Sequence, residues 1–106
     1  MENRASVIIA DASEEYRMML KKTMENAGDF QVIGDTGSGA EALRFVQQLH
    51  PQLLIMDLVL PELDGFGLLK HLQSMGERAP KTIVVSAFCL QRTVSQAVKM
   101  GVWYFL

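Results

Sequence analysis

The sequence predicts an α/β protein with a doubly wound parallel sheet, in which four strand–helix units are followed by a fifth strand. Short apolar, β-branched runs alternate with longer segments whose apolar residues recur at helical spacing. An almost wholly apolar run is typical of a strand that is buried on both faces of a parallel sheet. No repeat or linker interrupts this alternation. We therefore expect right-handed crossovers, with helices on both faces of one sheet.

Local signals define the individual elements. The first strand ends at Asp11, and Gly28 follows the first helix at a position where a left-handed residue commonly ends a helix. Ser38 and Glu41 have the S-x-x-E spacing of a capping box at the start of the second helix. The expected strands are 7–10, 30–36, 53–56, 82–85 and 102–106, and the expected helices are 13–27, 38–50, 66–75 and one that ends at 99.

The stretch LLIMDLVLPELDG, residues 53–65, carries the strongest functional signal. Four apolar residues lead directly into Asp57, and a turn with Pro61 follows and closes on Asp64-Gly65. A strand of this kind delivers a carboxylate to the carboxyl edge of a buried sheet, where open α/β proteins bind their ligands. Asp64-Gly65 is typical of turn and cap chemistry, so we do not assign it a catalytic role.

Composition excludes several classes of function. A chain of 106 residues with 49% hydrophobic residues suits one domain with one core. The net charge of −2 provides no basic surface for direct nucleic-acid contact. Cys89 is the only cysteine, which excludes an internal disulfide and favours the reducing cytoplasm. No apolar stretch is long enough for a secretion signal or a membrane span, so we expect a cytoplasmic protein without membrane contact.

Three strands are predicted to end at polar residues that meet at one edge of the sheet. Asp11, Asp57 and Ser86 follow the first, third and fourth strands. Two neighbouring carboxylates repel each other unless a cation lies between them. Carboxylate oxygens without His or Cys suit Mg²⁺, which keeps waters that a phosphate can displace. Asp57 could then act as a nucleophile toward a phosphoryl donor, and Ser86 could donate a hydrogen bond to a phosphoryl oxygen.

These residues resemble those of a known family. Asp11 after an apolar strand, MDLVLPELDG around Asp57, Ser86-Ala87 after TIVV, and GVWYFL at the end are similar to the receiver domains of bacterial two-component and phosphorelay response regulators. The resemblance runs along the whole chain. It implies a flavodoxin-like fold with sheet order 2-1-3-4-5.

The resemblance also implies roles for individual residues. Asp57 is then the phosphoacceptor, and Asp11, Asp57 and the backbone carbonyl of Val59 hold Mg²⁺. Ser86 is the switch hydroxyl, and Phe105 is the switch aromatic residue. The phosphoryl donor is a histidine kinase or phosphotransfer protein, and the response passes to a partner or a fused output domain, for example one that binds DNA. Such a domain is a signalling module rather than an enzyme, and at most catalyses its own phosphorylation and dephosphorylation.

The sequence departs from the family pattern at two places. Ala12 occupies the position of the usual second acid, which predicts weaker Mg²⁺ binding unless Glu14 or Glu15 compensates. The Lys-Pro that follows the fifth strand in the family does not appear before Leu106. We therefore expect residues 1–106 to be a receiver domain that is truncated at its C-terminal end, without the final helix of the family.

Alternative interpretations remain open at this stage. A degenerate receiver could dimerise or dock partners without phosphorylation, as the loss of the second acid at Ala12 suggests. A flavodoxin-like binder of a phosphorylated cofactor would need a glycine-rich loop after the first strand, and ADASEEYR there contains no glycine. Asp11 could merely cap the first helix, with Glu14 as its reciprocal partner, and Ser86 could simply close a strand.

Overall fold

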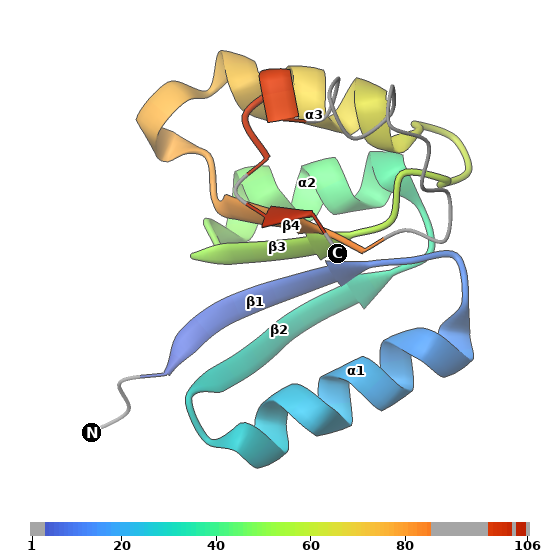
Figure 1. Cartoon of the computed structure of the whole chain (residues 1–106), viewed down its shortest axis with the longest axis vertical. Helices are drawn as coiled ribbons and strands as arrows, with labels where there is room; N and C mark the ends of the chain where they lie inside the picture. The colour runs from blue at the N-terminus through green and yellow to red at the C-terminus, as the bar shows by residue number, and fades with distance from the viewer. Residues whose placement is uncertain (1–3, 86–97, 103, 106) are drawn as a thin grey trace.

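The computed structural model describes residues 4–85, 98–102 and 104–105, and its elements alternate as predicted (Figure 1). The five strands form one sheet in the order β2-β1-β3-β4-β5, and every paired strand is parallel. This confirms the predicted flavodoxin-like order. The elements are β1 (Ala5–Ala10), α1 (Glu14–Ala27), β2 (Phe30–Thr36), α2 (Gly39–Leu49), β3 (Leu53–Met56), α3 (Gly65–Ser74), η1 (Gly76–Arg78), β4 (Lys81–Val84) and β5 (Tyr104–Phe105).

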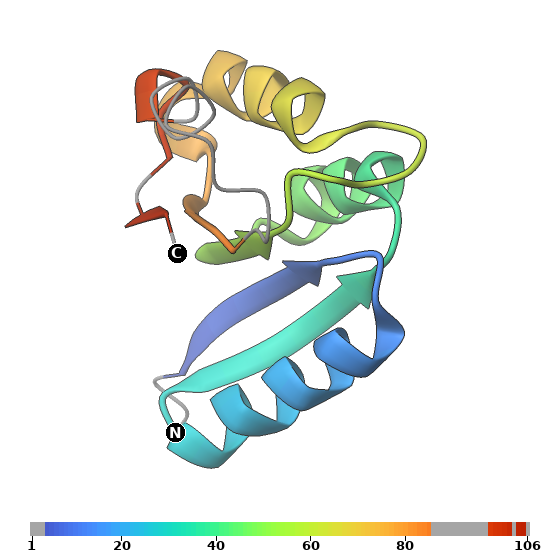
Figure 2. The same ribbon diagram turned by 45° about the vertical axis from the view of Figure 1, so that its right-hand side comes forward.

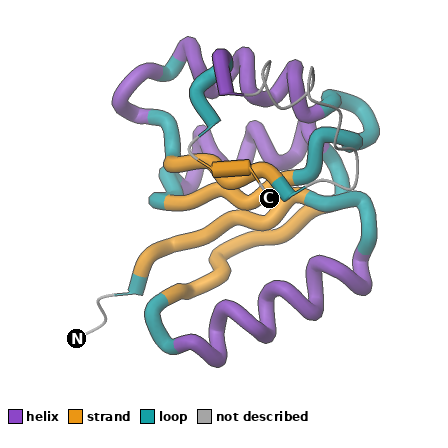
Figure 3. The backbone as a smooth tube through the Cα atoms, viewed as in Figure 1, coloured by secondary structure: helices purple, strands orange, loops and turns teal. Residues whose placement is uncertain are grey.

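The helices cover the two faces of the sheet unequally. Helix α1 lies on one face, and α2 and α3 lie on the other, as both views of the ribbon show (Figures 1 and 2). In the tube view the strands form a single twisted layer between these helices (Figure 3). The chain is therefore doubly wound, as the sequence predicts.

The face under α2 and α3 carries the larger core. Alternate residues of β1, β3 and β4 point to this face, and helical residues of α2 and α3 complete the cluster. Most of these side chains are fully buried. The buried members are Ile8, Ala10, Ala42, Val46, Leu54, Met56, Leu58, Leu60, Leu68, Leu69, Leu72 and Val84.

The face under α1 carries a smaller core, whose buried members are all strand residues. Helix α1 has no buried residue, although Leu20 and Met24 pack half-buried against the sheet. Met18 and Met19 are more than half exposed. The buried members are Val7, Ile9, Val32, Leu53 and Ile55.

Helix ends agree with most of the predicted signals. Gly28 ends α1 with a φ of 85°, in the left-handed region. The side chain of Ser38 caps α2 by accepting a hydrogen bond from the Glu41 N–H at 3.2 Å, as predicted. The reciprocal half of the capping box is wrong, because the Ser38 N–H donates to the Thr36 hydroxyl at 3.0 Å. The Glu41 carboxylate instead lies 3.8 Å from the Arg44 guanidinium.

The predicted boundaries shift by a residue or two elsewhere. Helix α3 begins at Gly65 rather than 66, because the Asp64 side chain caps it by accepting from the Gly67 N–H at 2.8 Å. Strand β4 spans residues 81–84 rather than 82–85, and the described part of the fifth strand is Tyr104–Phe105. The predicted fourth helix lies mostly outside the described residues. In the described parts of the chain, no helix combines the length and apolar character that crossing a membrane requires.

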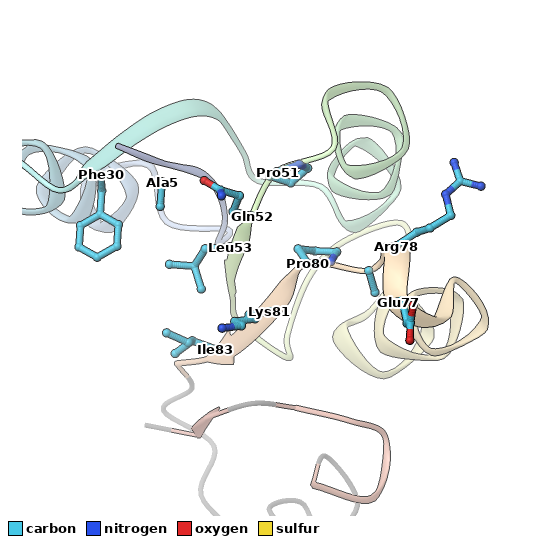
Figure 4. Close-up of a pocket in the computed structure, with 11 residues that line it drawn as sticks. Ala5, Phe30, Pro51, Gln52, Leu53, Glu77, Arg78, Pro80, Lys81 and Ile83 are labelled. Atoms are coloured by element: carbon cyan, nitrogen blue, oxygen red, sulfur yellow. The ribbon is translucent and has the colours of Figure 1, made fainter. Parts of the chain in front are cut away.

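A shallow apolar groove of about 630 Å³ opens on the α1 face of the sheet, at the amino ends of the strands. Phe30, Leu53 and Ile83 direct their side chains toward the same space (Figure 4). Glu77, Arg78 and Lys81 also line it. The groove therefore lies at the edge of the sheet opposite to Asp11 and Asp57, and its lining offers no paired carboxylates for phosphoryl chemistry.

Candidate functional site

Asp11 and Asp57 occupy equivalent positions on neighbouring strands. Ala10 of β1 is paired with Met56 of β3, so the residues that follow them leave the sheet at the same level. The ladder continues one step further, because the Asp57 N–H donates to the Ala10 carbonyl at 2.9 Å. The register of the two strands thus places both carboxylates together at the carboxyl edge of the sheet, as the sequence predicts.

Asp11 is the more deeply placed carboxylate, with an exposed fraction of 9%. Its Oδ1 accepts a hydrogen bond from the Ser13 N–H at 2.8 Å. The cap of α1 is Ser13, whose hydroxyl accepts from the Tyr16 N–H at 3.2 Å. The alternative that Asp11 is the helix cap is therefore wrong, although its carboxylate does hold the turn that leads into α1.

Burial raises the pKa of the Asp11 carboxyl above its ordinary value. The Ser13 N–H opposes this rise by bonding to the charged form, the negative charge of Asp57 adds to it, and the Arg17 guanidinium opposes it. The contribution of Asp57 agrees with the strand register, which places the two carboxylates side by side. Ionised Asp11 is thus destabilised where it stands, and a cation beside it would relieve that cost.

Asp57 lies half-buried at the start of the loop between β3 and α3. Its Oδ1 accepts a hydrogen bond from the Val59 N–H at 3.2 Å, so the chain turns back toward the carboxylate. The Val59 side chain is 64% exposed and points away from the core. This turn keeps the backbone of Val59 beside Asp57, which is where a carbonyl ligand from that residue would need to lie.

Two glycines fix the β3–α3 loop by close backbone approach. A Cβ at Gly65 would collide with the backbone of Leu58, and the Gly65 N–H donates to the Leu58 carbonyl at 2.8 Å. A Cβ at Gly39, at the start of α2, would collide with the Leu63 carbonyl. The Gly39 N–H also donates to the Pro61 carbonyl at 3.2 Å. The loop beside Asp57 is therefore held from two helices.

The remaining predicted residues are only partly placed. Ser86 lies outside the described residues. Phe105 belongs to β5, where it pairs with Val84, and its side chain is outside the description. Sequence reasoning missed Arg17, which contacts the backbone of Asp11; an arginine within an exposed helical pattern gives no signal of that contact.

The donor set fits a small hard cation. Each carboxylate uses one oxygen for a backbone N–H, and carboxylate and backbone oxygens are the ligands that Mg²⁺ prefers. Among the described residues, no third Asp, Glu, His or Cys joins this pair to form a metal cluster. Glu14 and Glu15 are exposed in the first turn of α1. The suggestion that one of them compensates for Ala12 is therefore not supported.

A 2-1-3-4-5 parallel sheet with paired carboxylates beyond its first and third strands defines a flavodoxin-like protein with an acidic site at the carboxyl edge. The chain belongs to the family of response regulator receiver domains, whose family model matches residues 7–106. This confirms the resemblance that the sequence motifs indicate.

Individual relatives agree with this assignment. The chain is 35% identical over 100 residues to the chemotaxis protein CheY of Thermotoga maritima. The matched region covers 94% of this chain and 82% of that protein. The response regulator domain of Thermotoga maritima CheB superposes with a TM-score of 0.90 at 27% identity, over 97% of this chain and 77% of that one. The receiver domain of NarL from Mycobacterium tuberculosis has a TM-score of 0.92 at 24% identity, and the superposition covers 98% of this chain and 83% of that one. This likeness shows that the two share a fold.

Proposed function

We propose that this receiver domain accepts a phosphoryl group on Asp57 from a histidine kinase or phosphotransfer protein, with the help of Mg²⁺. One observation carries the proposal. Strands β1 and β3 end at paired residues, so Asp11 and Asp57 follow side by side, close enough for their charges to interact. The ionised form of Asp11 is disfavoured first by burial and then by the negative charge of Asp57, and a cation between the two carboxylates would offset both costs.

The chemistry assigns one role to each part of the site. A carboxylate oxygen of Asp57 attacks the phosphorus atom, a new O–P bond forms, and the P–N bond of the phosphohistidine donor breaks. The imidazole leaves with the electron pair of that bond and takes up a proton. The Val59 N–H, which donates to Asp57 Oδ1, orients the attacking carboxylate. Asp11, Asp57 and the Val59 carbonyl would hold Mg²⁺, which when bound neutralises charge between the carboxylates and the phosphoryl oxygens.

The remaining parts of the proposal come from the family pattern. Ser86 would then move toward the phosphoryl group and donate a hydrogen bond to it. Phe105, in β5, would change its position in response to this movement of Ser86. The domain would transmit a state rather than turn over a substrate. A structurally similar chain from Staphylococcus aureus is described as a DNA-binding response regulator of the LuxR family, so a DNA-binding output is one class of partner to test.

The test is intact-mass spectrometry of the chain after incubation with a small phosphoryl donor across a Mg²⁺ titration. We expect a Mg²⁺-dependent phosphoryl adduct on the wild type and none on Asp57→Asn, which keeps the size and hydrogen-bonding oxygen of the side chain. Asp29→Asn, at an exposed acid between α1 and β2, is the matched control and should be phosphorylated normally. An adduct of equal yield on Asp57→Asn would refute the proposal. No adduct on the wild type would instead favour a degenerate receiver.

A further inference from the structure

Arg17 on α1 connects three segments that surround Asp11. Its Nη1 donates to the backbone carbonyl of Asp11 at 2.6 Å, and its Nε donates to Asp35 Oδ1, near the end of β2, at 3.0 Å. The Arg17 side chain is only 15% exposed, although it carries a charge. A cation this well enclosed is rare unless it is paired, so the ion pair and the carbonyl bond together account for its burial.

Gly37 leaves the space that the guanidinium occupies. A Cβ at Gly37 would lie 3.0 Å from Arg17 Nη1 and 3.6 Å from the Asp11 carbonyl oxygen. A side chain at this position would therefore press on the guanidinium. The turn after β2, the end of β1 and helix α1 thus form a cradle in which Arg17 is the central group.

The bonds around Asp11 determine its position almost completely. Its N–H donates to the Thr36 carbonyl at 3.0 Å, its carbonyl accepts from Arg17, and its Oδ1 accepts from the Ser13 N–H. Arg17 is the only side chain among these three partners, because the other two are backbone groups. A substitution at Arg17 consequently removes one of these three bonds without changing the strand register.

We propose that Arg17 is a positioning residue of the cation site, which holds the backbone of Asp11 so that its carboxylate stays beside Asp57. This inference rests on the proposed function, since it concerns the same Mg²⁺ site. The position of Asp11 matters more here than in a site with three acids, because Ala12 leaves Asp11 as the only acid supplied by the turn after β1. Misplacement of that carboxylate would leave only Asp57 and the Val59 carbonyl to bind the ion.

A positioning role and a purely electrostatic role of Arg17 predict opposite changes in cation affinity when Arg17 is replaced. Removing a positive charge near the site should by itself strengthen the binding of a cation. Removing a group that orients a ligand should weaken binding, and the loss of such supporting partners typically costs about 10-fold or more in metal affinity. The direction of the change therefore distinguishes a positioning role from a purely electrostatic one.

The experiment is a Mn²⁺ titration of the whole chain, followed by the electron paramagnetic resonance signal of free Mn²⁺, at about pH 8 so that carboxylates are ionised. We expect Arg17→Gln to bind about 10-fold more weakly than the wild type. Arg44→Gln is the matched control, because Arg44 is 63% exposed on α2, and it should bind within about twofold of the wild type. Gly37→Ala keeps the charge of Arg17 but displaces the guanidinium, and should also weaken binding.

A second readout separates this role from general destabilisation. At saturating Mn²⁺, the phosphorylation rate of Arg17→Gln should return to within about threefold of the wild type, because the ion restores the position of Asp11. Equal or tighter Mn²⁺ binding by Arg17→Gln would overturn the inference. If that variant does not fold, unchanged binding by Gly37→Ala overturns it and weaker binding supports it. A wild-type chain that binds no Mn²⁺ would overturn both this inference and the metal requirement of the proposed function.

Discussion

The two faces of the sheet stabilise the site in different ways. On the face of α2 and α3, fully buried side chains and two glycines hold the loop that follows Asp57 by close packing. On the face of α1, the helix buries no residue, and the turn that follows Asp11 is held by hydrogen bonds from Ser13 and Arg17. The loop that follows Asp57 is thus fixed by close packing, whereas the turn that follows Asp11 is fixed by polar contacts.

This difference indicates where the molecule should tolerate change. Packed backbone cannot move without a cost in free energy, because interiors are as dense as organic crystals. Each hydrogen bond at a partly exposed turn costs less free energy to break than packed backbone costs to move, because water can take the place of the lost partner. We therefore expect substitutions on the α2 and α3 face to act mainly on the stability of the fold, and substitutions around Asp11 to act mainly on the binding of ions.

The largest expected effect comes from neighbouring residues of β3 that point to opposite faces. Leu54→Ala, at a fully buried position under α2 and α3, should lower the free energy of unfolding by about 3–5 kcal/mol. Ile55→Ala, on the α1 face with 6% exposure, should cost about 2 kcal/mol, because the thinner cover can collapse into the space. Urea unfolding measures both. Equal costs would contradict the contrast between the faces.

A smaller effect is expected from Gly39, the glycine at which α2 contacts the loop that follows Asp57. Gly39→Ala should cost about 1–3 kcal/mol, because its Cβ meets the rigid carbonyl of Leu63. Gly67→Ala is the matched control within α3, since its Cβ would come under 3 Å only to the end of the flexible Leu63 side chain, at 2.7 Å, and would lie at an ordinary 3.4 Å from Asp64 Oδ1. That control should be neutral or stabilising by up to about 1 kcal/mol, through the higher helix propensity of alanine. A neutral Gly39→Ala would show that the loop is not held in this way.

The smallest effect concerns the carboxyl of Asp11 and depends on pH. Because its pKa is raised in the folded protein, the folded state holds this proton more tightly than the unfolded chain does. The resulting stabilisation is present below the ordinary pKa of 3.8 and is lost as the pH rises through the folded pKa. Asp11→Asn should therefore raise the Tm of the metal-free protein at pH 7, and this gain should vanish in acid.

Calorimetry of Asp11→Asn and wild type from neutral to acidic pH measures this difference. Asp29→Asn, at an exposed acid, provides the baseline for removing one negative charge. Added Mg²⁺ should make the Tm of the wild type the higher of the two. An ion at 100 times its Kd stabilises the wild type by about 2.7 kcal/mol, and the variant binds the ion more weakly because it lacks one carboxylate. A Tm advantage that persists unchanged in acid would show that the ionisation of Asp11 is not its source.

The sequence predicts the fold because each strand and helix carries its own local signal. The apolar run before Asp57 and the stop at Gly28 are confirmed at their expected places. The capping box at Ser38 is only half right, because the nearby Thr36 hydroxyl competes for the same N–H, and that choice depends on how β2 ends. Local spacing does not encode this competition.

The site is predictable to a lesser degree. Asp11 and Asp57 follow from the rule that parallel strands deliver their last residues to one edge. The contact between Arg17 and the Asp11 carbonyl depends on the angle at which α1 packs, and the collision of a Cβ at Gly39 with Leu63 depends on how α2 approaches the loop. The first contact joins residues only six positions apart and the second joins two separate segments, but both depend on how the elements pack, and the residue pattern of neither segment reveals them.

The most direct test of the account locates the phosphoryl group itself. The chain is treated with a small phosphoryl donor and Mg²⁺, the acyl phosphate is reduced with borohydride, and peptide mass spectrometry identifies the modified residue. We expect modification at Asp57 alone, and we expect it to be lost when Mg²⁺ is chelated. Modification at Asp11 or Asp64, or an equal yield at Asp57 without a divalent cation, would contradict the claim that Asp11 and Asp57 form one cation-dependent phosphoacceptor site.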